Sequence, residues 1–498
     1  MTITGPAAPA APPRTHYQVT FGVLSVAVAA YALLQSLVIP VLPTIQAGLH
    51  TSQNTVTWVL TAYLLSASIF TPIMGRLGDM LGKERMLVVA LIALTLGSVL
   101  SAVAGSVTVM LVGRVIQGVG GGVLPLSFGL IRDEFPGEKV SGAVGVIAAL
   151  ASAGAGLGIV LAGPIVAALD YHWLFWIPAG VLAVAALAAH LVVPESRIRT
   201  PGQLNWSAAA LLSAWLVALI LGISEAPTWG WASGKVIGLL IGAVALAGAW
   251  VIVESRSPQP LIDMRMMRIP AVWTTNLVAL LLGIGMYAVF AFLPEFLQTP
   301  PSAGYGFGVS ITVSGLILLP SSVFMFAFGV LSGRLSRRWG ARMLLVVGLL
   351  VSIITFVLLT VARAQEWEIL LAMVIQGVGF GMAYASMSAL VVEGVPASQT
   401  GVASGMNANI RTIGGSIGAA VMGSIVTASA HHGGLPSNSG YTAGFAFLTL
   451  AAVAAAVAAW FVPRSRRPTT RPGDHAATML HAELGMVAAG TLAGDESE

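Results

Sequence analysis

The hexapeptide VIQGVG occurs twice in this chain, at Val115–Gly120 and again at Val374–Gly379. The second copy begins 259 residues after the first, taking position 115 from position 374. The residue in front differs: Arg114 precedes the first copy and Met373 precedes the second. This pattern suggests that two halves of the chain share a Gln–Gly packing face and that only one half needs the charge.

A longer motif repeats at nearly the same separation. GRLGDMLGKER at Gly75–Arg85 resembles GRLSRRWGARM at Gly333–Met343, which begins 258 residues later. Runs of small residues also recur wherever membrane helices pack closely, which is the alternative explanation for VIQGVG. Because two separate motifs recur at nearly one offset, we interpret the chain as two homologous blocks.

The composition places the chain in a membrane. Of 498 residues, 57% are hydrophobic and only 8% are charged, whereas a soluble domain carries about a quarter charged residues. The chain has no cysteine, which excludes disulfides and thiol chemistry. Its basic residues lie in short loops between apolar runs and not in one patch, so we expect no nucleic-acid partner. Only three of the 23 basic residues are lysine, which suggests a bacterial source.

Windows of about 20 mostly apolar residues predict an all-α polytopic membrane protein with about fourteen transmembrane helices. The windows are 18–42, 54–75, 86–105, 107–130, 141–168, 173–193, 204–224, 235–253, 271–294, 309–332, 342–362, 367–391, 402–429 and 441–462. The first six and last six form two pseudo-symmetric six-helix bundles, with two helices inserted between them. The predicted domains are a disordered tail at 1–16, a bundle at 17–194, a linker with two extra transmembrane helices at 195–265, a bundle at 266–462 and a disordered tail at 463–498.

The loop charges predict the orientation. If the N-terminus is cytoplasmic, the outside loops hold only Lys235 and Arg363, and the inside segments hold nearly all other basic residues. This positive-inside bias predicts a multi-pass protein of the plasma membrane with both termini in the cytoplasm. Arg114 and Arg411 fall within spans, where a charge is costly and suggests function.

With these motifs the chain resembles the major facilitator superfamily, in its fourteen-helix drug:proton antiporter branch, over roughly residues 17–462. The fourth-helix motif Arg-x-x-Gln-Gly is met by Arg114, Gln117 and Gly118. The loop motif Gly-x-x-x-Asp-x-x-Gly-[Lys/Arg]-x-Arg is met by Gly75, Asp79, Gly82, Lys83 and Arg85. The resemblance implies that these five residues form a gating latch that holds the two halves shut on the inside.

The latch has a weaker copy in the second half. Arg337 stands where Asp79 stands in the first copy, and Met343 stands where Arg85 stands, so we expect an asymmetric latch. An acid at a helix end can accept backbone hydrogen bonds or pair with arginine. The alternative is a solvated basic loop that only sets the topology.

Proton coupling is implied by the resemblance. The family uses the fourth-helix arginine, here Arg114, in proton transfer, whereas the alternative is an arginine that snorkels to the outer interface. Few carboxylates reach the bilayer to carry the proton. Our candidates are Glu295, for which the alternative is a wet interfacial acid, and Asp133 at the inner end of the fourth span.

The fifth span carries a stripe of Gly154, Gly158 and Gly163, which would let helices approach and flex. It resembles the antiporter signature Gly-x-x-x-Gly-Pro-x-x-Gly-Gly imperfectly, because Ile159 replaces the proline; an ordinary packed helix is the alternative. In the first span Leu34 stands where the branch often carries an aspartate. Predicted substrate-cavity residues are Tyr31, Gln35, Ser36, Gln117, Tyr287, Phe290, Gln376 and Asn407.

We therefore predict a proton-driven secondary transporter that exports a lipophilic small molecule by alternating access. A symporter or uniporter of the same fold is the first alternative. A membrane enzyme is the second; the sequence has neither HExxH nor a clustered His/Asp array, and no catalytic or metal-binding residue is predicted. An ATP-driven pump would need GxxxxGK[ST], which does not occur. The expected partners are the lipid bilayer, the substrate and protons, with no cofactor and a monomeric chain.

Overall fold

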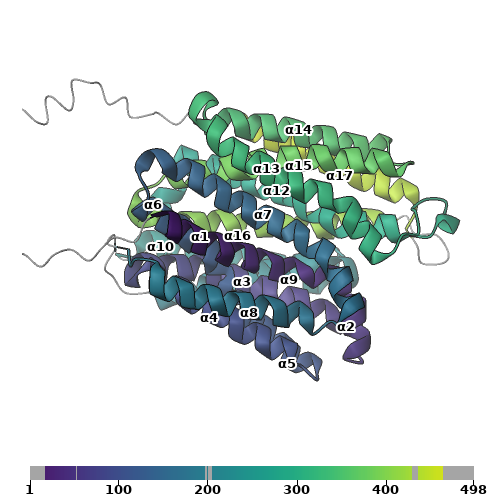
Figure 1. Ribbon diagram of the computed structural model, residues 1–498, viewed down its shortest axis with the longest axis horizontal. Helices are drawn as coiled ribbons and strands as arrows, with labels where there is room; N and C mark the ends of the chain where they lie inside the picture. Colours follow the sequence, from purple (N-terminus) through teal and green to yellow (C-terminus); the bar gives the residue numbers. More distant parts are fainter. Residues whose placement is uncertain are drawn as a thin grey trace, which may run out of the picture. The chain divides into compact units, whose positions relative to one another are not determined.

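The computed structural model describes residues 17–51, 53–196, 199, 205–258, 260–428 and 436–463. The regular secondary structure in these ranges consists of helices, without a β-strand (Figure 1). These residues belong to one compact unit that extends to Pro463. Fourteen helices in it are long and apolar enough to cross a membrane, so the predicted fold class and number of spans are confirmed. The two predicted tails lie outside the described residues, apart from Pro463.

The first half contains six spans, two of which are interrupted. Its elements are α1 (Tyr17–Leu37), η1 (Ile39–Val41), α2 (Leu42–Gly48), α3 (Gln53–Leu81), α4 (Lys83–Ala102), α5 (Val107–Gly118), η2 (Val119–Gly122), α6 (Val123–Glu134), α7 (Gly137–Ala168) and α8 (Trp173–Val192). Each break lies at residues that disfavour a regular helix: Pro40 and Pro43 just after α1, and three consecutive glycines within η2.

The second half repeats this order after two additional helices. The intervening elements are α9 (Trp206–Trp229), α10 (Gly234–Arg256) and the short α11 (Met264–Met267). The second half comprises α12 (Pro270–Gln298), η3 (Pro301–Ala303), α13 (Ile311–Trp339), α14 (Ala341–Val361), α15 (Glu366–Glu393), η4 (Ala397–Gln399), α16 (Thr400–Ala428) and α17 (Asn438–Trp460). Helices α9 and α10 pack on each other, and α9 also contacts α3 and α16.

Helix boundaries repeat at the same offset as the sequence motifs. Helix α13 begins at Ile311 and ends at Trp339, which are the positions that the offset of the loop motif gives for the two ends of α3. The offset of VIQGVG likewise relates the beginning of α15 to that of α5, and the end of α15 to that of α6. The two halves differ locally at this span: η2 separates α5 from α6 in the first half, whereas α15 is one continuous helix in the second.

The turns after α3 and α13 show why both copies of the repeated motif have a glycine where the first helix ends. Gly82 has φ +122° and Gly340 has φ +81°, and the two glycines occupy equivalent positions of the repeat. A side chain is strained at such angles, so glycine permits the next helix to begin at once. The helices also extend past the apolar windows at this end, where α3 continues to Leu81 and α13 to Trp339.

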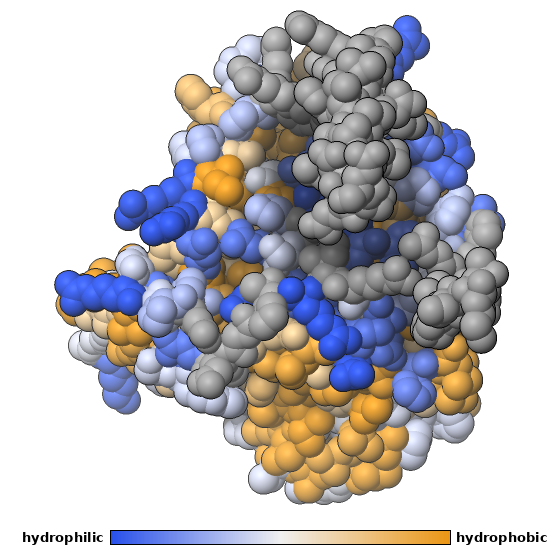
Figure 2. Space-filling model, turned by 90° about the vertical axis from the view of Figure 1, so that its left-hand side faces the viewer, coloured by the Kyte–Doolittle hydropathy of each residue, from blue (hydrophilic) through white to orange (hydrophobic). Residues whose placement is uncertain are grey.

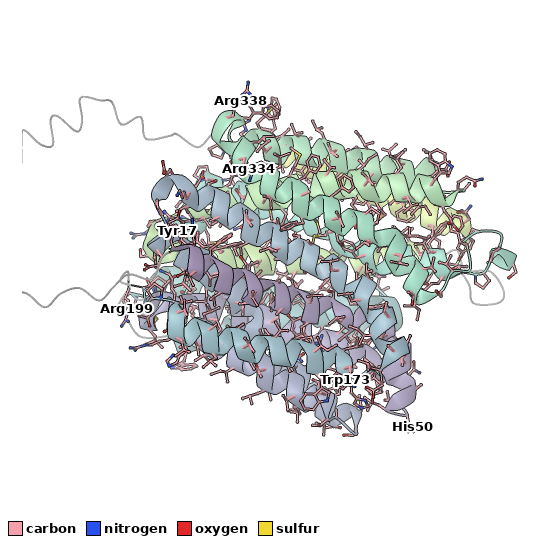
Figure 3. The ribbon with its side chains drawn as sticks, viewed as in Figure 1. Tyr17, His50, Trp173, Arg199, Arg334 and Arg338 are labelled. Carbon is pink, nitrogen blue, oxygen red and sulfur yellow. The ribbon has the colours of Figure 1, made fainter. Side chains whose placement is uncertain are left out.

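One end of the helical unit is rich in basic side chains. Figure 3 shows Tyr17, Arg199, Arg334 and Arg338 at this end and His50 and Trp173 at the other. We call the first the basic end and the second the opposite end. Figure 2 views the basic end directly, and hydrophilic residues gather over it with apolar surface along its lower edge.

The two halves meet along two pairs of long helices. Helix α7 of the first half packs on α13 of the second, and α3 of the first half packs on α16 of the second. Helices α6 and α16 also contact each other. These crossings position the candidate site, because its residues lie on the faces that the halves turn toward each other.

Candidate functional site

The two copies of VIQGVG lie in equivalent surroundings. A Cβ atom placed on Gly118 would collide with Ser66 of α3, and one placed on Gly377 would lie 2.8 Å from Cβ of Phe324 in α13. Ser66 and Phe324 are themselves equivalent positions, because they are separated by the offset of the loop motif. The first glycine of each copy therefore lets the helix pack on the corresponding neighbour in its own half.

The second glycine of each copy repeats this relation on the other side. A Cβ atom on Gly120 would collide with Leu94 of α4, and one on Gly379 would lie 2.5 Å from Oγ of Ser352 in α14. Leu94 and Ser352 are again separated by the offset of the loop motif. The repeated hexapeptide is thus a shared packing face, and the two halves are structurally related around it.

Arg114 is the centre of a buried polar network in the first half. Its side chain is 0% exposed; Nε donates to the carbonyl of Val59 at 2.9 Å, and Nη1 donates to Oε1 of Gln117 at 2.7 Å. Gln117 in turn donates to Oγ of Ser98 at 3.0 Å. The guanidinium also lies 4.4 Å from the ring centroid of Tyr63. Arg114 therefore points into the bundle and does not snorkel toward an interface.

The second copy lacks this network. Gln376 is 1% exposed, and within the described part of the chain neither its amide nitrogen nor its oxygen has a hydrogen-bond partner. Met373, which replaces the arginine, is fully buried in the hydrophobic core. The second copy, which has methionine in place of the arginine, thus keeps the glycine packing face but lacks the polar contacts that Arg114 and Gln117 make in the first copy.

Two pairs of glycines bring the halves together at the basic end. A Cβ atom on Gly401 of α16 would lie 2.9 Å from the carbonyl oxygen of Gly75 in α3. A Cβ atom on Gly333 of α13 would lie 3.1 Å from Cα of Gly142 in α7. Gly333 is the repeat equivalent of Gly75, and Gly401 is the repeat equivalent of Gly142, so the two crossings are related by the repeat. The basic end is closed in this conformation.

Asp79 crosses between the halves at the closed end. It is 1% exposed, and its Oδ2 accepts from the backbone N–H of Val402 at 3.4 Å. Val402 lies in the first turn of α16, where unpaired N–H groups and the helix dipole favour an anion. The structure therefore places Asp79 and Gly75 of the predicted latch against the second half.

Lys83 links two acids inside the first half. Its Nζ lies 2.6 Å from Oδ2 of Asp133 and 3.6 Å from Oδ1 of Asp79. Ser196, in the segment after α8, donates to the same Asp133 oxygen. Gly129 leaves room for the lysine stem, because a Cβ atom there would lie 2.7 Å from Cδ of Lys83. Lys83 thus supports Asp79 and does not itself reach the second half.

The environment of Arg85 differs from that of Asp79 and Lys83, because Arg85 is largely exposed. Its Nε lies 3.2 Å from Oε2 of Glu195, and the arginine side chain is 65% exposed. The Glu195 carboxylate also lies where a Cβ atom on Gly82 would be. Arg85 and Gly82 therefore join the α3–α4 turn to the segment after α8, within the same half. The side chain of Arg337 lies outside the described residues.

A second contact between the halves at this end was not predicted from the sequence. Arg132, near the end of α6, donates through Nη1 to the carbonyl of Val392 and to Oγ1 of Thr400. Val392 is in the last turn of α15, where orphan carbonyls and the helix dipole favour a cation. Asp79 and Arg132 thus complement two successive helix ends of the second half. The only sequence signal was a lone arginine in the last turn of a span.

The glycine stripe of the fifth span lies at helix crossings. Cβ atoms on Gly154 and Gly158 would meet α1, at Ala32 and Ser36, and a Cβ atom on Gly163 would lie 2.7 Å from Oγ1 of Thr312 in α13. Helix α7 therefore approaches α1 and α13 closely on different faces. This packing is compatible with both interpretations of the stripe, flexing and simple close packing.

A central cavity lies between the halves at the level of η2. Its volume is about 70 Å³, below the ~300–1,000 Å³ typical of sites for drug-sized ligands, so it would have to widen around a substrate. Three predicted cavity residues line it: Tyr31, Gln35 and Tyr287. The others that line it are Ala32, Leu64, Ala67, Ser68, Thr71, Gly121, Leu124, Ala151, Ser152, Ala155, Met286, Tyr384, Ala408, Asn409, Arg411 and Thr412.

Five predicted cavity residues are not brought to its wall. Ser36 donates to the carbonyl of Ala32 at 3.1 Å within α1, and Phe290 packs half-buried against the hydrophobic core. Asn407 donates to Oδ1 of Asn276 at 2.9 Å, between α16 and α12. The other two do not line it either: Gln117 hydrogen-bonds with Arg114 and Ser98 in its own half, and Gln376 is buried.

Arg411 lies in the cavity wall, although the sequence indicated it only as a charge within a span. It lines the cavity with its side chain over Tyr384, 4.4 Å from the guanidinium carbon to the ring centroid, and it is 7% exposed. Its neighbour Asn409 crosses between the halves, donating to the carbonyl of Ser68 at 3.0 Å. The available signal was an arginine inside a span, close in sequence to a polar side chain.

The three candidates for proton coupling lie apart. Arg114 is buried within the first half, Asp133 lies in the Lys83 network at the basic end, and Glu295 lies exposed near the opposite end of α12. A polar route does connect Arg114 to the central cavity. Its partner Tyr63 shares a hydrogen bond with Tyr31, which lines the cavity.

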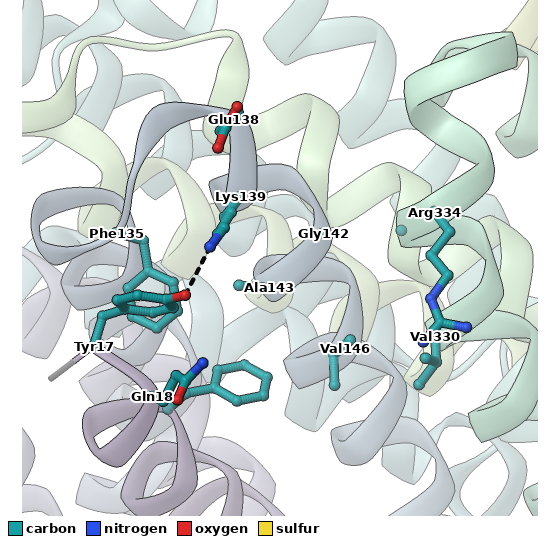
Figure 4. Close-up of a pocket in the computed structure, with 12 residues that line it drawn as sticks. Tyr17, Gln18, Phe135, Glu138, Lys139, Gly142, Ala143, Val146, Val330 and Arg334 are labelled. Carbon is teal, nitrogen blue, oxygen red and sulfur yellow. Dashed lines mark hydrogen bonds between the residues drawn. The ribbon is translucent and has the colours of Figure 1, made fainter.

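Two further cavities lie at the ends of the unit. A groove of about 360 Å³ at the basic end runs between Tyr17 of α1, Lys139 of α7 and Arg334 of α13, and Lys139 donates to the Tyr17 hydroxyl at 2.7 Å (Figure 4). A cavity of about 600 Å³ at the opposite end includes Arg363 and Asn438. Arg363 donates to Oδ1 of Asn438 at 2.5 Å, and partial burial lowers the pKa of its guanidinium.

Two related six-helix halves around a central cavity, closed at one end by contacts between the halves, define a membrane transporter of the alternating-access type. The family model of the Major Facilitator Superfamily matches residues 24–419 and 275–489. The chain belongs to this family.

Characterised relatives and solved structures agree with this assignment. The multidrug transporter protein MdtP of Bacillus subtilis is 31% identical over 385 residues, covering 75% of this chain and 68% of that protein. The tetracenomycin C resistance and export protein of Streptomyces glaucescens is 28% identical over 409 residues, covering 80% and 74%. The proton:xylose symporter XylE has the same fold, with a TM-score of 0.65 at 15% identity, over 90% of this chain and 96% of that one.

Proposed function

We propose that this protein is a proton-coupled exporter of a lipophilic small molecule, such as a drug or antibiotic. Relatives that cover most of the chain are named as multidrug and antibiotic export proteins, which supports this substrate class. The observation that carries the proposal is a central cavity combined with closure of the basic end by contacts between the halves. No cofactor takes part, because the proton gradient supplies the driving force, and the monomer is the working unit.

The proposed orientation places the basic end in the cytoplasm of a bacterial cell. Arginines gather at this end, as the positive-inside rule requires of cytoplasmic segments (Figure 3). In this orientation the contacts of Asp79 and Arg132 close the cytoplasmic side. Loading from the cytoplasm then requires these contacts to break and the α3–α16 crossing to part.

We assign Arg114 a role in coupling proton movement to the substrate. The guanidinium of Arg114 lies over the ring of Tyr63 in a cation–π contact. Tyr63 is in turn hydrogen-bonded to Tyr31 in the cavity wall. A substrate that displaces Tyr31 would therefore disturb the surroundings of Arg114 without touching it. Asp133 and Glu295 remain our candidates for the carboxylate that carries the proton.

The test uses everted membrane vesicles with an imposed pH gradient, acidic inside. We expect tetracenomycin C, used as the first test compound, to cause a proton leak that depends on its concentration. The leak should disappear in Arg114→Ala and persist in Arg256→Gln, an exposed arginine on α10 that serves as the matched control. Substrate equilibration that ignores the gradient would indicate a uniporter, and movement of substrate in the same direction as protons would indicate a symporter.

A further inference from the structure

The central cavity contains one formal charge. Among its described lining residues there is no Asp, Glu, Lys or His, and Arg411 is the one ionised side chain. Arg411 takes part in none of the ion pairs within the described ranges. Its side chain lies over the Tyr384 ring, 4.4 Å from the guanidinium carbon to the centroid, and hydrogen-bonds with the Tyr384 hydroxyl. Tyr384 is neutral, so these contacts leave the positive charge uncompensated by an anion.

The polar atoms around the cavity are also incompletely paired. Within the described structure, Nε of Arg411, Oγ of Ser68 and Oγ of Ser152 have no hydrogen-bond partner, although each residue is more than nine-tenths buried. Oδ1 of Asn409 is likewise unpaired. Buried polar groups are normally satisfied, so several unpaired groups around one cavity point to a ligand that pairs with them. Three of these four atoms belong to groups that can donate, which favours a ligand rich in acceptor oxygens.

The wall of the central cavity also contains aromatic side chains, in addition to the charge of Arg411. Tyr31, Tyr287 and Tyr384 come from three different helices and line the same cavity. Tyrosine rings stack on planar aromatic ligands, and their hydroxyls can pair with ring substituents. A cationic ligand would meet Arg411 in a site with little water to screen the repulsion, whereas an anionic oxygen would be attracted there.

We propose that the cavity selects planar aromatic compounds that bear a carboxylate or an acidic phenol, and that Arg411 is the residue that pairs with the acidic group. This inference rests on the proposed function, because it names the substrate class of the same cavity. It differs from a general preference for lipophilic compounds, since it predicts discrimination by charge between ligands of one shape.

The test is equilibrium binding to the purified full-length protein in nanodiscs, followed by anthracene fluorescence. Three probes share one ring system and differ in charge: anthracene-9-carboxylate, anthracene-9-carboxamide and 9-(aminomethyl)anthracene. We expect the carboxylate to bind about 10- to 100-fold more tightly than the amide, the range that corresponds to one charge-assisted hydrogen bond, and the ammonium to bind most weakly.

The variants locate the effect. Arg411→Gln should remove the preference for the carboxylate and leave amide binding within about threefold, Arg411→Lys should retain part of the preference, and Arg256→Gln should behave as wild type. The wild-type series alone decides the question if Arg411→Gln does not fold. The inference is overturned if the ammonium probe binds as tightly as the carboxylate, if none of the three binds, or if Arg411→Gln weakens all three equally.

Failure of this inference is distinguishable from failure of the proposed function. A protein that prefers the carboxylate but shows no substrate-driven proton leak retains the inference and loses the proton coupling. A protein that exports the ammonium probe against its gradient retains the proposed export and loses the inference.

Discussion

We expect the substitution Gly401→Ala to weaken the closed state of the basic end. The added Cβ atom would lie 2.9 Å from the carbonyl oxygen of Gly75 and 3.1 Å from Oδ1 of Asp79. The first distance is shorter than a carbon–oxygen contact allows, and the atom that it meets is backbone, so α3 and α16 must move apart. Overpacking of this kind costs about 1–3 kcal/mol, and it applies only while the basic end is closed.

Gly142→Ala is the matched control, because Gly142 is the repeat equivalent of Gly401 and occupies the related crossing of α7 with α13. A Cβ atom on Gly142 has its nearest contact at 3.7 Å, the carbonyl oxygen of Gly333, which is an ordinary van der Waals distance. Both substitutions raise helix propensity by the same amount, which cancels in the comparison. A difference between the variants therefore measures the contact and not the alanine.

Because the chain has no native cysteine, a single introduced cysteine is the one thiol that a maleimide can label. Thr71→Cys places a thiol in the cavity wall, one helical turn before Gly75 on α3, at a position that is 6% exposed. In everted vesicles a membrane-impermeant maleimide reaches it when the basic end opens. We expect Gly401→Ala to raise the labelling rate about 5- to 150-fold and Gly142→Ala to leave it within about twofold. Equal rates in the two variants, at equal protein content, would refute the reasoning.

Three further predictions concern charges. Asp79→Asn removes the anion from the start of α16 and should raise labelling of Thr71→Cys, by an amount equivalent to about 1–2 kcal/mol; an unchanged rate would show that the carboxylate does not hold the closed state. Arg132→Gln removes the donor to the last turn of α15 and should act in the same direction by about 1.5–3 kcal/mol, whereas Arg256→Gln should label like wild type. Arg114→Lys should reduce substrate-driven proton flux at least about tenfold, because an ammonium cannot reproduce a planar guanidinium with several donors; full flux would contradict a specific role.

The fold could be predicted because its determinants are periodic in the sequence. Apolar windows gave the fourteen spans, and the offset of VIQGVG gave the relation between the halves, since the helix boundaries repeat with the motifs. The interruption at η2 was not predicted, because a run of glycines is compatible with both a helix and a turn. The helix ends at the basic end were also underestimated, because their last turns are polar and extend beyond the apolar core of the span.

The site was harder to predict, because it depends on which face of each helix meets the other half. Gln35 and Ser36 are adjacent in α1, yet Gln35 lines the cavity and Ser36 turns to its own backbone. A step of one residue rotates a side chain by about 100° around a helix. The sequence alone did not establish which face of each helix points toward the other half. Asp79 was predicted from its motif, whereas Arg132 belongs to no motif and is defined by a contact with a helix that is remote in sequence.

The two crossings between the halves differ in the contacts that they make. Helices α7 and α13 approach closely near both ends, at Gly142 with Gly333 and at Gly163 with Thr312. Hydrogen bonds from charged side chains to helix ends lie elsewhere, where Asp79 meets the start of α16 and Arg132 meets the end of α15. A gate needs contacts that break as units, and hydrogen bonds to helix ends meet that need. The shared glycines therefore explain why both crossings can be close, and the unshared charges explain why only one of them is suited to act as the gate.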